Sequence, residues 1–203
     1  PGVSEETRQR ILELKEASLL KNIKTISKQT LGSDIGLIIF KEGSGLIADT
    51  PFFSELIDSL DRWTNQNAFH FRVNQVSSDN VRDYIDSLNA SDMAGLLILA
   101  TEMSRENAVL FKKFLKKPFV FLDAYFPGLN VDAVLMDNVG GISLAIDYAI
   151  KMGHKSIGYL RSAIPCQNFY DRYSRFVSES VFHKELDTSK VIQLTPSIDQ
   201  ACE

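Results

Sequence analysis

Residues 35–40 read IGLIIF, a run without a single charged side chain. GLLILA (95–100), FVFL (119–122) and AVLM (133–136) are apolar in the same continuous way. A strand buried on one face alternates apolar with polar residues, whereas a continuous apolar run is typical of a strand buried on both faces. The four runs therefore predict strands at the centre of a sheet, with helices covering both of its sides.

Amphipathic segments separate these runs, as an alternation of strands and helices requires. The expected strands span residues 35–40, 68–76, 95–100, 119–125, 133–137, 156–162 and 191–194, and the expected helices span 51–63, 81–89, 104–117, 141–153 and 168–181. In the first helix, Phe53, Leu56, Ile57, Leu60 and Trp63 share one stripe, which we expect to face the sheet. This order predicts the α/β class, with a doubly wound parallel sheet and right-handed crossovers.

The composition is that of an ordinary globular protein. The chain has 203 residues, 44% of them hydrophobic and 24% charged, and a net charge of −4 gives no overall tendency to bind nucleic acid. No apolar run is long enough to span a membrane, and the N-terminus does not resemble a signal peptide. Cys166 and Cys202 are not spaced like metal ligands, so two free thiols in a reducing compartment, the cytoplasm, are expected.

Motifs of enzymes are weak in this sequence. GSGLIA (43–48) matches the loose dinucleotide-binding pattern, but Lys41 and Glu42 separate it from the strand, and the next helix is expected to start only at Pro51. A flexible loop is the favoured interpretation. The three histidines lie far from one another in the sequence, and no nucleophile-elbow pattern is present. We therefore expect neither catalysis, nor a bound cofactor, nor a metal site.

The segments that follow the strands are the place to look for a ligand, because ligands of open parallel sheets bind beyond the carboxyl ends of the strands. These segments supply rings, amides, carboxylates and one cation: Phe52, Phe53, Tyr125, Phe169, Asp123, Asp137, Asn138, Asn168, Asp171 and Arg172. Flat rings with short polar groups suit a polyol such as a sugar. The alternatives are a solvated arginine early in a helix for Arg172 and strand-end caps for Asp123 and Asp137.

The chain before the first strand has two unlike parts. Residues 1–16 predict a mostly polar helix capped by Ser4. Residues 17–33 contain three lysines and no acid, and in a helix the lysines would share one face. Such a segment could bind phosphates and insert an isoleucine into a minor groove, or it could be a solvated linker.

Several of these stretches, taken in order, resemble the LacI/GalR family of bacterial transcription regulators. VSEETRQRI (3–11) is similar to the last helix of the family's DNA-binding headpiece. DAVLMDNVGG (132–141) and KMGHKSIGYL (151–160) are similar to two motifs of its effector-binding core, and NFYDRYSRF (168–176) to the stretch with the effector-binding arginine. The resemblance extends over nearly the whole chain.

The resemblance implies a periplasmic-binding-protein-like fold of two lobes, the second incomplete in this chain. Residues 1–19 would be the last helix of a helix-turn-helix headpiece, and residues 20–34 a hinge. Residues 35–153 would form the N-terminal lobe, and residues 154–203 the beginning of the C-terminal lobe.

The resemblance also implies site residues. Those expected to bind the effector are Thr50, Pro51, Phe52, Phe53, Asp137, Asn138, Cys166, Asn168 and Arg172. Those expected to bind DNA from the hinge are Lys21, Asn22, Ile23, Lys24, Ile26 and Lys28. The sequence departs from the family where Lys21 replaces a proline, and in a longer loop at 41–49.

The sequence thus predicts a transcriptional regulator, a repressor in our interpretation, that forms a homodimer on operator DNA and responds to a sugar or sugar phosphate. No membrane partner is expected. A sugar-binding protein of an uptake system is the first alternative, a nucleotide-dependent enzyme the second, and control by a protein corepressor is left open. The sequence does not identify the effector or the sign of regulation.

Overall fold

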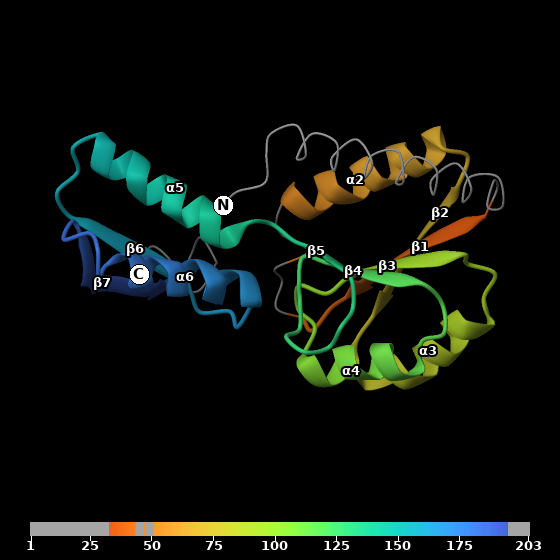
Figure 1. Cartoon of the computed structure of the whole chain (residues 1–203). Helices are drawn as coiled ribbons and strands as arrows, with labels where there is room; N and C mark the ends of the chain where they lie inside the picture. Colours follow the sequence, from red (N-terminus) through yellow and green to blue (C-terminus); the bar gives the residue numbers. More distant parts are fainter. Residues whose placement is uncertain (1–32, 44–46, 48–50, 195–203) are drawn as a thin grey trace, which may run out of the picture.

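The computed structural model describes residues 33–43, 47 and 51–194. In this part, the chain forms two α/β units, each built on its own parallel sheet (Figure 1). The predicted N-terminal helix and the six hinge residues lie outside the described residues, as does most of the loop GSGLIA.

The first unit has a five-stranded sheet in the order β2-β1-β3-β4-β5, and all neighbouring strands are parallel. Its strands are β1 (Asp34–Phe40), β2 (His70–Val76), β3 (Gly95–Leu99), β4 (Phe119–Leu122) and β5 (Ala133–Val134). Its helices are α2 (Pro51–Gln66), the short 3₁₀ helix η1 (Ser78–Asn80), α3 (Val81–Ala90) and α4 (Arg105–Phe114). The predicted doubly wound parallel sheet is confirmed.

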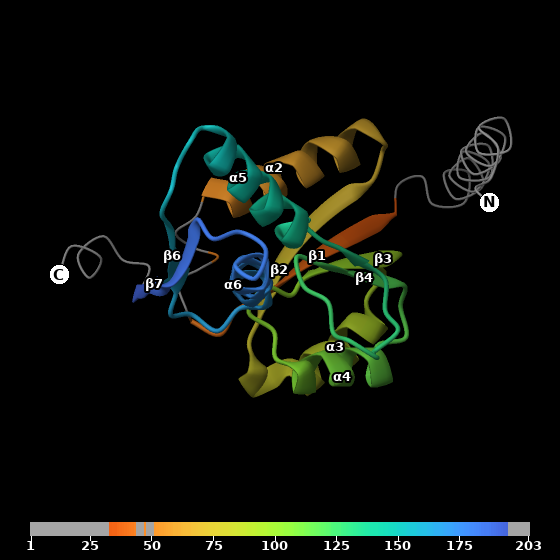
Figure 2. The same cartoon turned by 60° about the vertical axis from the view of Figure 1, so that its left-hand side comes forward.

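Strand β1 explains why its sequence is apolar throughout. Successive side chains of a strand point to opposite faces. Leu37 and Ile39 pack in the cluster that contains Phe53 of α2, whereas Ile38 and Phe40 pack in the cluster that contains residues of α3 and α4. Figure 1 and Figure 2 show α2 on one side of the sheet and α3 with α4 on the other. Both faces of the strand are therefore removed from water.

Two details of the first unit differ from the expectation. Strand β5 has only two residues, and Val134 is 63% exposed, because β5 is the edge strand and the chain then leaves this sheet. The prediction that AVLM is buried on both faces is wrong. Trp63 does not pack on the sheet either: it is 54% exposed and stacks on Phe69, with ring centroids 6.1 Å apart.

The second unit contains α5 (Asn138–Lys151), β6 (Ile157–Ser162), α6 (Gln167–Glu179) and β7 (Leu186–Leu194), with β6 and β7 parallel. Its core is formed by Ile146, Phe176 and Leu186. Helix α5, which the sequence division assigns to the first lobe, packs with α6 over the second sheet. The division at residues 19, 34 and 153 stays a prediction.

Local sequence signals mark where the helices begin and end. Pro51 opens α2, as expected for a residue with no amide hydrogen to satisfy. Gly153 follows the end of α5 with a φ of +89°, a left-handed conformation that glycine adopts without strain. No helix within the described ranges has the length and apolar character needed to cross a membrane.

Candidate functional site

A cavity of about 260 Å³ lies where the two units meet, at the carboxyl edge of the first sheet. Its walls come from the start of α2, the segments after β3, β4 and β5, and the start of α6. The residues that line it are Phe52, Phe53, Thr101, Asp123, Met136, Cys166, Asn168, Phe169 and Arg172. This is the edge at which ligands of open α/β sheets bind.

Two adjacent rings at the start of α2 form part of the apolar wall. Phe52 and Phe53 pack edge to face, with centroids 5.1 Å apart. Phe53 is buried against the sheet, while Phe52 is exposed. Phe53 therefore anchors the helix start, and Phe52 remains available to a ligand.

The polar part of the wall is a chain of hydrogen bonds that crosses from the first unit to the second. Thr101 donates from Oγ1 to Oδ2 of Asp123 over 2.7 Å. Asn168 donates from Nδ2 to the main-chain oxygen of Asp123 over 3.2 Å and accepts at Oδ1 from Nδ2 of Asn138 over 2.9 Å. Arg172 donates from Nε to Oδ1 of Asn138 over 2.6 Å.

Asp123 holds an unusual position in this chain. Its φ of +63° is left-handed, a conformation that aspartate tolerates better than most residues. Its side chain is buried, and Oδ1 has no hydrogen-bond partner among the described residues. Burial raises the pKa of the Asp123 carboxyl, and the hydrogen bond from Thr101, the nearby amide of Asn168 and the charge of Arg172 lower it in part. A ligand hydroxyl is the kind of donor that Oδ1 lacks.

Arg172 supplies the positive charge of the site. Its guanidinium carbon lies 5.7 Å from the centroid of the Phe169 ring. Only Nε is engaged, by Asn138, within the part of the chain that the structure describes. Since a guanidinium has five N–H donors, four remain for hydroxyl or phosphate oxygens of a ligand.

Cys166 precedes the first residue of α6 and is buried as a free thiol. Burial raises the pKa of this thiol, which outweighs the effect of the main-chain N–H groups of Asn168 and Phe169 that point to it. The thiol is therefore held neutral and acts as a small apolar wall of the cavity. Cys202 lies outside the described residues.

The structure brings together five of the nine predicted effector-binding residues on the cavity wall: Phe52, Phe53, Cys166, Asn168 and Arg172. Asn138 lies behind the wall and connects Arg172 to Asn168. Asp137 is exposed and caps α5, accepting from the main-chain N–H of Gly140 over 2.8 Å, so its geometry is that of a helix cap. Pro51 opens α2 beside the cavity without lining it, and Thr50 lies outside the described residues.

Thr101, Met136 and Asp123 line the cavity but were not among the nine predicted residues. All three follow strands of the first sheet, and Asp123 was recognised as a polar group of that edge. The position of Thr101 just beyond the carboxyl end of β3, which ends at Leu99, was the signal that could have identified it.

A second, larger cavity of about 610 Å³ shares Thr101 and Cys166 with the first and extends it along the sheet edge. Tyr125 and Phe126 line it, together with Arg105, which donates to the main-chain oxygen of Pro127 over 2.8 Å. Among the residues that the structure describes, His, Cys, Asp and Glu form no group that could hold a metal ion. The rings and polar groups that line the two cavities are binding groups for a small organic molecule.

No protein-family model matches the chain. Among curated proteins, it is 24% identical over 183 residues to the HTH-type transcriptional repressor PurR of Mannheimia succiniciproducens, a match that covers 86% of this chain and 52% of that protein. It is 23% identical over 189 residues to the ribose operon repressor of Haemophilus influenzae, covering 88% of this chain and 53% of that protein. The chain spans about half the length of these relatives.

Solved structures give the same result for the fold. The complex of the transcriptional regulator CelR with cellobiose aligns with a TM-score of 0.64 at 16% identity, covering 98% of this chain and 59% of that one. The lac repressor dimer bound to operator and the anti-inducer ONPF aligns with a TM-score of 0.66 at 13% identity, covering 97% and 62%. A LacI-family regulatory protein from Chloroflexus aggregans aligns with a TM-score of 0.66 at 18% identity, covering 82% and 59%.

The fold and the cavity between two α/β units define a periplasmic-binding-protein-like domain. Within that class, the chain is similar over most of its length to the effector-binding core of LacI-family regulators, so the resemblance found in the sequence is confirmed. The relatives are bacterial transcriptional repressors.

Proposed function

We propose that this protein is a DNA-binding transcriptional repressor, not an enzyme, whose affinity for its operator is set by a sugar or sugar-like effector bound between the two units. The observation that carries this proposal is the hydrogen-bonded chain from Arg172 through Asn138 and Asn168 to Asp123. It spans both units at the wall of a cavity, so a ligand that contacts it acts on their relative position.

The chemistry of the wall supports a polyol. Phe52 and Phe169 offer ring faces, Arg172 offers free N–H donors, and Asp123 offers an unsatisfied acceptor. A sugar ring has an apolar face, which can pack on the aromatic rings, and a rim of hydroxyls, which can bond the donors and the acceptor. The CelR structure contains cellobiose, and another relative is named for the ribose operon. A sugar phosphate would use Arg172 as its anion partner.

In this proposal, the chain before the first strand binds DNA. Residues 1–19 are the end of a headpiece, residues 20–34 the hinge, and Lys21, Lys24 and Lys28 its phosphate contacts. The protein works in the cytoplasm as a homodimer on a near-palindromic operator, because paired headpieces read two half-sites related by symmetry. Effector and operator are then linked by a coupling free energy.

Calorimetry of the full chain against monosaccharides, disaccharides and sugar phosphates tests the effector site. We expect one class to bind, and Arg172→Gln to weaken that binding by about tenfold or more. Binding of NAD with no binding of any sugar would instead support the nucleotide-dependent alternative.

The coding sequence upstream of the Pro1 codon tests the regulator class separately. Two short helices with a tight turn, running into VSEETR, are expected there. A signal peptide in that place would overturn the proposal in favour of a sugar-binding protein of an uptake system.

A further inference from the structure

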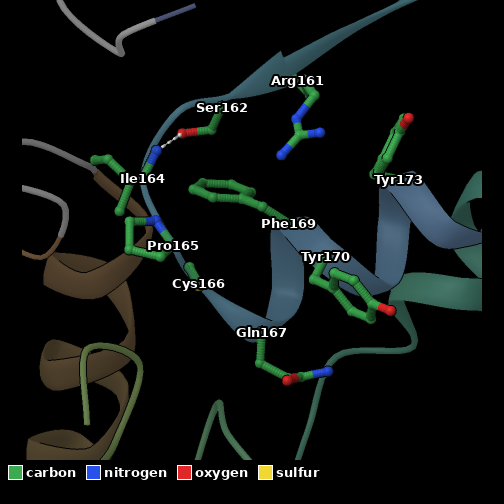
Figure 3. A pocket seen from close by; sticks show the side chains of 9 residues that line it. All are labelled: Arg161, Ser162, Ile164, Pro165, Cys166, Gln167, Phe169, Tyr170 and Tyr173. Carbon is green, nitrogen blue, oxygen red and sulfur yellow. Dashed lines mark hydrogen bonds between the residues drawn. The ribbon is translucent and has the colours of Figure 1, made fainter. Parts of the chain in front are cut away.

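A cavity of about 380 Å³ lies on the second unit alone, between the end of β6 and the first turns of α6 (Figure 3). Its lining residues are Arg161, Ser162, Ile164, Pro165, Cys166, Gln167, Phe169, Tyr170 and Tyr173. Its volume lies within the range of small-molecule pockets. The candidate effector site does not use Arg161, Ser162, Tyr170 or Tyr173.

Arg161 is the cation of this 380 Å³ cavity. Its guanidinium carbon lies 4.6 Å from the centroid of the Tyr173 ring. Figure 3 shows the guanidinium on the same side of α6 as the Phe169 ring. In the described part of the chain, the Arg161 side chain forms neither an ion pair nor a hydrogen bond, whereas the side chain of every other described arginine forms one or both. A guanidinium stacked on a ring keeps its in-plane donors free for an anion.

The neighbours of Arg161 define the shape of the ligand. Phe169, Tyr170 and Tyr173 give the cavity three aromatic rings, and Tyr170 is 65% exposed. The Ser162 hydroxyl oxygen accepts from the N–H of Ile164 over 3.1 Å, which leaves its own proton to be donated. Donor groups next to aromatic rings fit a flat molecule with an anionic group.

We propose that this cavity is a second ligand site, for a small aromatic anion whose phosphate or carboxylate is held by Arg161 and Ser162 while its ring packs on Phe169 and Tyr170. The site is separate from the proposed effector site, but Cys166 and Phe169 line both cavities. A ligand in one cavity therefore fixes a wall of the other, and the two ligands should affect each other's affinity equally. Only this coupling rests on the proposed function.

Calorimetry with the full chain tests the binding, with phenyl phosphate and benzoate as probes and inorganic phosphate and benzyl alcohol as their anion-only and ring-only counterparts. We expect phenyl phosphate or benzoate to bind about tenfold more tightly than either counterpart, and the better of the two identifies the anion. Failure of both to bind, or equal binding of inorganic phosphate, would overturn the aromatic-anion site.

Three variants test whether the probe binds in this cavity. Arg161→Gln should weaken binding of the better probe by about tenfold or more. Tyr170→Ala, at an exposed ring that the fold does not need, should weaken it several-fold. Arg62→Gln, at an exposed arginine on α2, is the matched control and should leave it unchanged. Equal melting temperatures of the variants and the parent exclude loss of folding.

The Arg172→Gln variant distinguishes a failure of the second site from a failure of the proposed effector site. It should reduce sugar binding and leave the binding of the aromatic anion in place, whereas Arg161→Gln should do the reverse. If Arg172→Gln abolishes binding of the anion and Arg161→Gln does not, the anion occupies the first cavity and the second site is wrong. If no sugar binds but the anion still depends on Arg161, the proposed function fails and the second site stands.

Discussion

The side chain of Asn168, on α6, donates to the main-chain oxygen of Asp123, at the end of β4, over 3.2 Å. At its other end it accepts from Asn138 over 2.9 Å. One buried amide thus connects the first sheet to both helices of the second unit. Because the three residues are buried, water cannot replace these bonds if the amide is removed.

Asn168→Ala should therefore lower the free energy of unfolding by about 1–3 kcal/mol, because it leaves the amide of Asn138 buried without its acceptor. Urea denaturation followed by circular dichroism measures this. Asn65→Ala, at an exposed position of α2, is the control and should stay within about 0.5 kcal/mol of the parent. A variant at Asn168 as stable as this control would show that the amide does not join the units.

Replacement of Arg172 by alanine should weaken the binding of the effector, once identified, by about 1.5–3 kcal/mol, the usual contribution of a hydrogen bond to a charged group. Calorimetry gives the value directly. Arg175→Ala is a control on the same helix, since Arg175 bonds Ser143 and Glu179 outside the cavity. Unchanged affinity in Arg172→Ala would remove this residue from the site.

The sequence predicted the fold well where burial alone decides the pattern. Strand β1 is apolar throughout because both faces are covered, and its predicted and observed ranges differ by one residue. Strand β7 begins at Leu186, five residues before the predicted start at Val191. Its first half contains Asp187, Thr188 and Ser189, and this polar stretch at the sheet edge carries no strand signal that could be read without its partner β6.

The sequence predicted that the site lies at the carboxyl edge of the sheet, but not which of its residues are hydrogen-bonded to one another. Phe52, Asn168 and Arg172 lie in segments that follow strands, which placed them at the ligand-binding edge, and the family resemblance then assigned them to the effector site. The roles of Asp137 and Asn138 could not be separated, because an Asp-Asn pair before a helix reads equally as a cap and as a ligand contact. Only the packing of α5 on α6 shows that Asp137 caps and Asn138 connects.

Asp123→Asn should make the stability of the protein less dependent on pH. Burial raises the pKa of Asp123 in the folded state above its ordinary value of 3.8, so the folded state keeps this proton to higher pH than the unfolded state does. The free energy of unfolding consequently falls as the pH rises from the ordinary value through the raised one. Because asparagine cannot ionise, the variant does not lose stability in this way as the pH rises.

Urea denaturation between pH 4 and pH 8 measures the difference. The Asp123→Asn variant should be more stable than the parent at neutral pH, and the gap should narrow as the pH falls toward the ordinary pKa of the carboxyl. Asp58→Asn, at an exposed carboxyl of α2, is the control. A gap that is the same at every pH would show that ionisation of Asp123 does not cost stability.

Replacement of glycine by alanine should have opposite effects on stability at Gly36 and at Gly141. An alanine Cβ at Gly36, in β1, would lie 2.6 Å from Sδ of Met93 and 2.8 Å from Cδ2 of Leu96, so the core beneath α3 must shift. Overpacking of this kind costs about 1–3 kcal/mol. At Gly141, inside α5, the added Cβ would meet no atom within 4 Å, and alanine is the better helix former by about 0.8–1 kcal/mol.

Gly36→Ala should thus lower the midpoint of urea unfolding and Gly141→Ala should raise it, each measured against the parent chain under one set of conditions. The pair is its own control, because both changes add one methyl group and remove the same backbone freedom from the unfolded chain. A raised midpoint for Gly36→Ala would mean that the space around β1 adapts to the methyl group, and that the close approach of Met93 does not restrict position 36. A lowered midpoint for Gly141→Ala would contradict the expected gain in helix propensity.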